Sequence, residues 1–290
     1  MSNPKLHHYV PVFYLKRFAD NTSRFWVFDK RTKKTFQTTP YSVASETHFY
    51  RVPEFIGTDQ DPLFLEKQLS CLETIVAQIT EQWFVALQGM KPMDKLNITT
   101  ETRKQISFYI ALQFLRTAES RDILSLFAEE HGGYQSGVSP EEKINLHARL
   151  LCEEGLLDDI TRRVFDSIWI FARNSTATPL FTSDNPVCFK TSDNKMWLKG
   201  PGILSIGMYV VFPLSPSIVL YCYEESYWKK IEKFDCTLSP VKFTTEMVEH
   251  ENSGQIFMAS RFVISPTNDF EFARDFLDSI GTDRYAPHDR

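Results

Sequence analysis

Two adjacent histidines, His7 and His8, stand directly before an aromatic and apolar run that ends at Phe18. Residues near a chain end are usually frayed unless they are docked, and an apolar run of this kind must be docked against a core. A neutral imidazole can accept or donate a proton near neutral pH and can ligate a metal ion. This histidine pair is therefore a candidate chemical centre, although hydrogen-bonded structural histidines are the commoner case.

Five further polar residues lie on or next to apolar helix faces. Gln113 and Arg116 share the apolar face of one predicted helix, and Arg121 follows that helix. Asn252 and Gln255 share the apolar face of another. A buried amide or guanidinium without a partner costs several kcal/mol, so these groups require partners. The partners could belong to a buried network or to a bound ligand.

Asp184 and Asn185 come at the end of a predicted strand, and Pro186 prevents further pairing there. In a turn, Asp and Asn side chains satisfy the local backbone. Alternatively, a carboxylate and an amide at a strand end project into a cleft, which is a common position for a site built on a rigid sheet. The sequence leaves both interpretations open.

Other polar residues have simpler interpretations. Glu66 and Glu73 are seven residues apart and share a helix face, so they could be a pair of acids in a site, although a solvated face is the default. His147 is predicted to lie on the surface. Cys188 lies within an apolar strand and is best interpreted as a core residue.

The composition favours a folded protein that could bury a large core. Of the 290 residues, 42% are hydrophobic and 14% aromatic, which excludes a disordered chain. The net charge of −5 argues against a general basic surface for duplex DNA, although a local basic groove remains compatible with it.

The cysteines and the N-terminal residues indicate a cytoplasmic protein. The five cysteines are far apart and include no CxxC, so neither a disulfide framework nor a zinc knuckle is indicated. The first residues do not resemble a secretory signal. No stretch approaches the roughly twenty apolar residues that span a bilayer, and we expect no membrane association.

Periodicity predicts the elements that must position these residues. Aromatic and β-branched residues flanking a polar turn predict a β-hairpin between Arg24 and Thr38. Helical spacing follows over residues 61–88, 99–131, 139–154 and 158–167. Period-two segments at 169–173, 180–189, 208–214 and 218–223 predict four strands of an antiparallel meander, and residues 244–260, 261–266 and 270–280 predict a helix, a strand and a closing helix.

These elements predict an α+β fold with an N-terminal β-hairpin region, a central helical layer and a C-terminal antiparallel sheet with closing helices. We expect residues 1–290 to form a single compact domain. The alternative division is into residues 1–167, with the hairpin and helices, and residues 168–290, with the sheet and its helices.

The chain resembles a bacterial family called domain of unknown function 4238. Five motifs in order carry the resemblance and span nearly the whole chain: His7-His8-Tyr9-Val10-Pro11 with Phe13-Tyr14-Leu15, Gln113 with Arg116, Thr182-Ser183-Asp184-Asn185-Pro186-Val187, Phe212-Pro213-Leu214-Ser215-Pro216, and Asn252 with Gln255 before Ala259 and Arg261. The resemblance implies a bacterial or prophage-borne cytoplasmic protein with a link to conflict with phage. It supplies no catalytic assignment.

The first functional hypothesis is a hydrolase of phosphodiesters, a nuclease for RNA or DNA that acts as a toxin or effector in bacterial anti-phage defence. His7 or His8 would activate water or a hydroxyl, Arg116 would stabilise charge on the phosphate, and Asp184 would orient the imidazole. The candidates for holding a divalent metal ion are His7, His8 and Asp184. Substrate positioning would fall to Gln113, Asn185, Arg121, Asn252 and Gln255.

Two alternatives remain open at this stage. The same polar residues could form a buried network in a non-enzymatic sensor or interaction protein. Alternatively, Arg116, Arg121 and backbone donors could bind a nucleotide or another anion. Under these hypotheses the partner is a nucleic acid, a nucleotide or another protein, and the sequence does not determine the oligomeric state.

Overall fold

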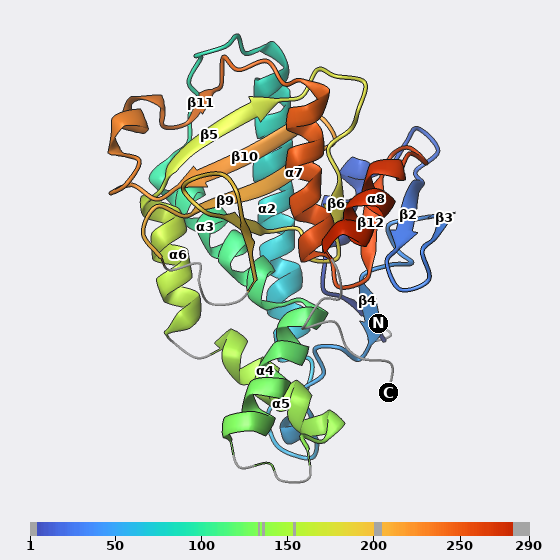
Figure 1. The fold of residues 1–290 in the computed structure, drawn as a ribbon. Coiled ribbons are helices and arrows are strands. Elements are labelled where there is room, and N and C mark those ends of the chain that lie inside the picture. The colour runs from blue at the N-terminus through green and yellow to red at the C-terminus, as the bar shows by residue number, and fades with distance from the viewer. Residues whose placement is uncertain (1–4, 133, 135–136, 153–154, 200–204, 281–290) are drawn as a thin grey trace.

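A computed structural model describes residues 5–132, 134, 137–152, 155–199 and 205–280 of the chain. Within these residues, helices pack around a six-stranded, a four-stranded and a two-stranded sheet, as Figure 1 shows. The predicted α+β class is confirmed. In the described part of the chain, no helix is both long enough and apolar enough to cross a membrane.

The large sheet has the strand order β11-β5-β10-β9-β7-β8. Its strands are β5 (Ile168–Arg173), β7 (Cys188–Lys190), β8 (Trp197–Leu198), β9 (Tyr209–Ser215), β10 (Ile218–Tyr223) and β11 (Thr237–Leu238). The predicted meander was wrong in its strand order, because β10 lies between β5 and β9. The short strand β11, which was not predicted, runs parallel to β5. Strand order depends on long-range pairing, which local periodicity does not record.

The small sheet joins the two ends of the chain. The predicted hairpin forms from β2 (Phe25–Asp29) and β3 (Lys34–Thr38). The hairpin is also joined to the C-terminal part of the chain, because β2 pairs with β12 (Phe262–Ser265). The buried residues of β2 require a neighbour on its second edge, and the C-terminal strand supplies it.

The predicted strand over residues 180–189 is divided between the two sheets. β6 (Thr182–Ser183) pairs with β12 in the small sheet, whereas β7 pairs with β9 in the large one. The break lies at Asp184-Asn185-Pro186, where proline has no N–H for a ladder. A segment that was predicted as one strand therefore connects the two sheets.

Two long helices cover one face of the large sheet, as Figure 1 shows. They are α2 (Phe64–Gly89) and α3 (Thr100–Leu115). Trp83 of α2 packs against Trp169 of β5, with ring centroids 6.1 Å apart, and Phe114 of α3 packs edge-on against Phe189 of β7 at 4.7 Å. The Thr99 side chain caps α3 by accepting from the Thr102 amide, which confirms the predicted helix start.

The other helices complete the fold. They are α1 (Val12–Leu15), α4 (Ala118–His131), α5 (Pro140–Cys152), α6 (Leu156–Asp166), α7 (Thr245–Met258) and α8 (Glu271–Ile280). At Gly254, α7 approaches β8 so closely that a Cβ atom there would lie 2.6 Å from the Trp197 ring. Only glycine allows this contact.

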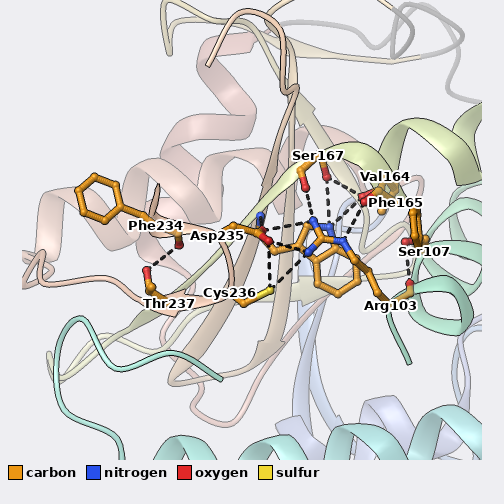
Figure 2. Close-up of polar contacts among 10 residues, drawn as sticks. Arg103, Ser107, Val164, Phe165, Ser167, Phe234, Asp235, Cys236 and Thr237 are labelled. Atoms are coloured by element: carbon orange, nitrogen blue, oxygen red, sulfur yellow. Dashed lines mark hydrogen bonds and ion pairs between the residues drawn. The ribbon is translucent and has the colours of Figure 1, made fainter. Parts of the chain in front are cut away.

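An arginine clamp fixes α3 to α6 and to the edge of the large sheet (Figure 2). Arg103 of α3 donates to the carbonyl oxygens of Phe165 and Ser167, just where α6 ends, and forms a 2.8 Å ion pair with Asp235. The guanidinium also lies over the Trp169 ring. Because these bonds occupy the guanidinium, we interpret the clamp as structural.

Candidate functional site

The N-terminal segment docks through backbone and aromatic contacts. β1 (Leu6–His8) pairs with β4 (Ser45–Thr47), and α1 follows directly. The Tyr9 carbonyl accepts two hydrogen bonds from α3, from Gln113 Nε2 at 3.0 Å and from Arg116 Nε at 3.1 Å. The predicted docking of this segment is confirmed. Gln113 and Arg116 hold the histidine segment against α3.

Arg116 brings a buried positive charge to this segment. Its side chain is fully buried, and Nη2 lies 2.7 Å from Glu73 Oε1 on α2. Burial alone would lower the pKa of Arg116, but Glu73 reverses this effect and the pKa is raised. The guanidinium therefore stays charged at every accessible pH.

Glu66 and Glu73 lie on the same face of α2, about two helical turns apart, as their seven-residue spacing predicts. Burial, reinforced by the charge of Glu73 and opposed by Arg116, raises the pKa of Glu66 to about 7. The side chains of Glu66 and Glu73 remain 21% and 25% exposed, so both are only partly buried. The pair thus combines an acid that is protonated near neutrality with a carboxylate held by arginine, a pattern typical of acid–base sites.

The two histidines point into different surroundings. The fully buried His7 accepts a hydrogen bond on Nδ1 from the Tyr50 amide and lies 3.8 Å from Glu66 Oε2. His8 is partly exposed and contacts the Tyr41 carbonyl through Nε2 at 3.2 Å. A carbonyl can only accept, so Nε2 carries the proton and Nδ1 of the neutral ring carries the lone pair.

The surroundings of His8 favour its neutral form. Burial lowers the pKa of His8, and Arg116 contributes in the same direction, while the Tyr41 carbonyl and Glu73 oppose it. A neutral imidazole at neutral pH is a potential proton acceptor.

Three buried polar atoms on one face of α3 lack partners. Tyr109 OH, Gln113 Oε1 and Arg116 Nη1 make no hydrogen bond within the described residues. Their positions follow the i, i+4, i+7 spacing of a helix face. Buried polar groups are almost always paired, so this row indicates a place where water or a ligand atom can bind.

The Asp184 carboxylate is fully occupied by a different part of the chain. It accepts hydrogen bonds of 2.8–3.0 Å from the backbone amides of Ser260, Arg261 and Phe262 and from the Ser260 hydroxyl. Burial raises the pKa of Asp184, and these donors oppose the rise. Its neighbourhood contains the Tyr9 side chain, whose pKa is raised by burial and by the Asp184 charge.

The remaining predicted residues of the C-terminal part are also hydrogen-bonded. Asn185 donates to the Glu119 carboxylate and to the Met258 carbonyl. Asn252 bonds both the Phe181 amide and the Pro179 carbonyl. Gln255 contacts Ser183, Pro186 and Cys188. These three side chains fix α7 to the segment that crosses between the two sheets.

Arg121 and His147 form a separate buried pair. Arg121 donates to the Phe49 carbonyl and to His147 Nδ1, and its guanidinium lies 3.4 Å from the Phe49 ring centroid. The prediction that His147 lies on the surface was wrong, since only 1% of it is exposed. Burial, with help from Arg121, lowers the pKa of His147 to about 3. Its helix face is covered by residues 49–50, a contact that the sequence does not reveal.

The structure therefore separates the predicted site residues into groups. His7, His8, Gln113 and Arg116 gather with Glu66 and Glu73 around the docked N-terminal segment. Asp184, Asn185, Asn252 and Gln255 gather around the end of α7. Among the described residues, no group of three or more His, Cys, Asp or Glu side chains is arranged to hold a metal ion.

Glu66 and Glu73 are the residues whose importance the sequence understated. Their shared face was visible from their spacing, but a solvated pair and a site pair have the same pattern in sequence. The decisive information is that Arg116 from α3 lies against Glu73.

Comparison with known proteins gives a family but no activity. A family model described as "Protein of unknown function (DUF4238)" matches residues 6–269. No curated protein and no solved structure matches the chain. The matched range includes the acid pair, the histidine segment and the residues around the end of α7.

Proposed function

The chain belongs to the DUF4238 family, and we propose that it is a hydrolase of phosphodiesters in RNA or DNA. The observation that carries the proposal is the pair of partly exposed acids, Glu66 with a pKa of about 7 and Glu73 bonded to the buried Arg116. An acid with a pKa near the working pH is well suited to protonate a leaving group. A fixed cation beside it favours an anionic substrate.

The proposed reaction is a single displacement at phosphorus. A water molecule attacks the phosphorus atom while His8 Nδ1 accepts one of its protons. The bond from phosphorus to the leaving sugar oxygen breaks, and protonated Glu66 gives its proton to that oxygen. The buried positive charge of Arg116 stabilises, through space, the negative charge that develops on the phosphoryl oxygens, and Glu73 holds Arg116 in position. A divalent cation is not required for this proton balance, and its effect is part of the test.

The test is cleavage of end-labelled single-stranded RNA, single-stranded DNA and plasmid by the purified chain, with EDTA or with Mg²⁺ or Mn²⁺. We expect Glu66→Gln to lower the cleavage rate by about 10²–10⁴-fold, because it removes the general acid. The matched control is Glu130→Gln, which changes an exposed acid on α4 and should leave the rate within about twofold.

The pH profile adds a second criterion. Because protonated Glu66 is the proposed acid, the wild-type rate should fall about tenfold per pH unit above pH 7, and this decline should be absent from the residual activity of Glu66→Gln. Absence of cleavage under every condition, or full activity of Glu66→Gln, would overturn the proposal.

The proposed cellular role is that of a toxin or effector in anti-phage defence in the bacterial cytoplasm. The support is the resemblance of the sequence motifs to prophage-borne proteins. Expression of the wild type, but not of Glu66→Gln, should then arrest growth or reduce phage yield.

One observation favours a non-enzymatic alternative. Four of the predicted site residues form hydrogen bonds to other residues of the chain: Asp184, Asn185, Asn252 and Gln255. Such a network can stabilise a fold without taking part in a reaction. In that case His8→Ala would lower thermal stability and affect no separable activity.

A further inference from the structure

An open groove of about 700 Å³ lies between the N-terminal helical segment and α2. Phe13, Lys16 and Arg17 line it on one side, and Gln78, Gln82 and the acid Glu81, which is paired with Arg17, line it on the other. Lys16 and Arg17 belong to the short 3₁₀ helix η1 (Lys16–Phe18), which continues α1. The groove is thus built from the histidine segment and from the helix that carries the acid pair.

The groove continues the surface of the candidate site. Ala77, which also lines it, lies one helical turn after Glu73 on the same face of α2. At its other side, Arg17 is close enough to Tyr109 to lower the pKa of that tyrosine, against the larger effect of burial. The α2 segment from Glu73 to Gln82 is about 14 Å long at 1.5 Å per residue. A strand of a few nucleotides has this length.

Tyr41 connects His8 to the groove. Its carbonyl contacts His8 Nε2, and its ring lies 5.2 Å below the Lys16 ammonium. The Tyr41 side chain is 56% exposed, so part of its surface is accessible to a base. Arg17, by contrast, is already bound to Thr80 and Glu81 and packs over Phe84.

Lys16 is the cation of the groove that remains available. It is exposed, and within the described part of the chain no carboxylate lies within salt-bridge distance of it. Lys16 shares the groove with Gln78 and Gln82, and the Tyr41 ring lies beside Lys16. A positive charge together with an accessible aromatic ring is a combination that binds single-stranded nucleic acid by phosphate contact and base stacking. The groove offers no broad basic surface, which agrees with the acidic net charge of the chain.

We propose that this groove binds a single-stranded nucleic acid and leads one of its phosphodiesters to the Glu66–Glu73 pair. The proposal rests on the proposed function for the cleavage step only, since binding can be measured without cleavage. Lys16 contacts a phosphate, and Tyr41 stacks against a base next to His8.

The experiment measures binding of fluorescein-labelled 12-mers, oligo(U) and oligo(dT), by anisotropy to the Glu66→Gln variant in EDTA. We expect Lys16→Ala to weaken binding about three- to tenfold. The plot of the logarithm of the binding constant against the logarithm of the salt concentration should also become less steep, by about one unit of slope. Tyr41→Ala should weaken binding about tenfold through loss of stacking.

Matched controls are available for both variants. Lys104→Ala removes an exposed lysine on α3, and Tyr227→Ala removes a tyrosine that is also 56% exposed but lies near η4 (Lys229–Phe234). Both controls should bind as the parent does. All four side chains are exposed, so unchanged melting temperatures should accompany the binding data.

The outcomes separate the two proposals. Binding that is equally strong in Lys16→Ala, Tyr41→Ala and the controls, or no binding of either 12-mer, overturns the groove as the binding site. Binding that depends on Lys16 and Tyr41 supports it, even if Glu66→Gln cleaves as well as the wild type, in which case only the proposed function fails. Preference for oligo(U) or oligo(dT) then identifies RNA or DNA as the substrate.

Discussion

The raised pKa of the Glu66 carboxyl should make the free energy of unfolding of the protein depend on pH. Its pKa rises from the ordinary 4.5 to about 7 on folding, so the folded chain holds this proton more tightly than the unfolded chain. The contribution of this proton to the free energy of unfolding is fully present below about pH 4.5 and is lost as the pH rises through 7. At pH 8 the ionised carboxylate therefore destabilises the fold.

We predict that Glu66→Gln is more stable than the wild type at pH 8, by about 1–2 kcal/mol, and gains little at pH 4.5. This energy is smaller than the free energy that corresponds to the full pKa shift, because the Glu66 side chain is partly solvated. Urea unfolding at both pH values measures it, with Glu130→Gln as the control. An equal effect at the two pH values would show that the Glu66 pKa is not raised.

At the scale of elements, Asp184 connects the segment between the two sheets to the start of β12. Its carboxylate accepts from three successive backbone amides, of Ser260, Arg261 and Phe262. Removing it leaves several donors without a partner in a buried region. The turn between α7 and β12 would then lose its main polar support.

We predict that Asp184→Ala lowers the free energy of unfolding by about 3–5 kcal/mol, because buried donors lose their acceptor. Asp193→Ala, which removes an exposed loop carboxylate, should cost less than about 0.5 kcal/mol. Guanidinium unfolding measures both. Wild-type stability of Asp184→Ala together with loss of cleavage would instead move Asp184 into the reaction.

At the scale of the whole molecule, β12 holds the two ends of the chain together. It lies between β2 from the N-terminal part and β6 from the crossing segment. Val263 on β12 is fully buried and pairs with Phe28 on one side and Ser183 on the other. If residues 1–290 form one domain, damage to β12 should weaken the entire chain.

We predict that Val263→Ala lowers the unfolding free energy by about 2 kcal/mol and keeps a single transition. Far-UV circular dichroism and tryptophan fluorescence should give the same midpoint. The control Val85→Ala changes a valine that is 66% exposed on α2 and should have little effect. Two separate transitions would favour the division into residues 1–167 and 168–290.

The sequence by itself determined the local elements and the burial of their polar residues. Periodicity of 3.6 or 2 predicted α2, α3, α7 and the hairpin β2–β3, since each follows from short-range backbone geometry and caps such as Thr99. The apolar faces around Gln113, Arg116, Asn252 and Gln255 also predicted correctly that these side chains are buried.

Only the tertiary structure decided which polar groups meet. Glu73 acquires its importance because α3 places Arg116 against it, and Asp184 is satisfied by residues that lie 76–78 positions further along the chain. The strand order differs from the order of the sequence for the same reason. Local preferences act over a few residues, whereas hydrogen-bond partners and strand neighbours are selected when distant segments pack into one core.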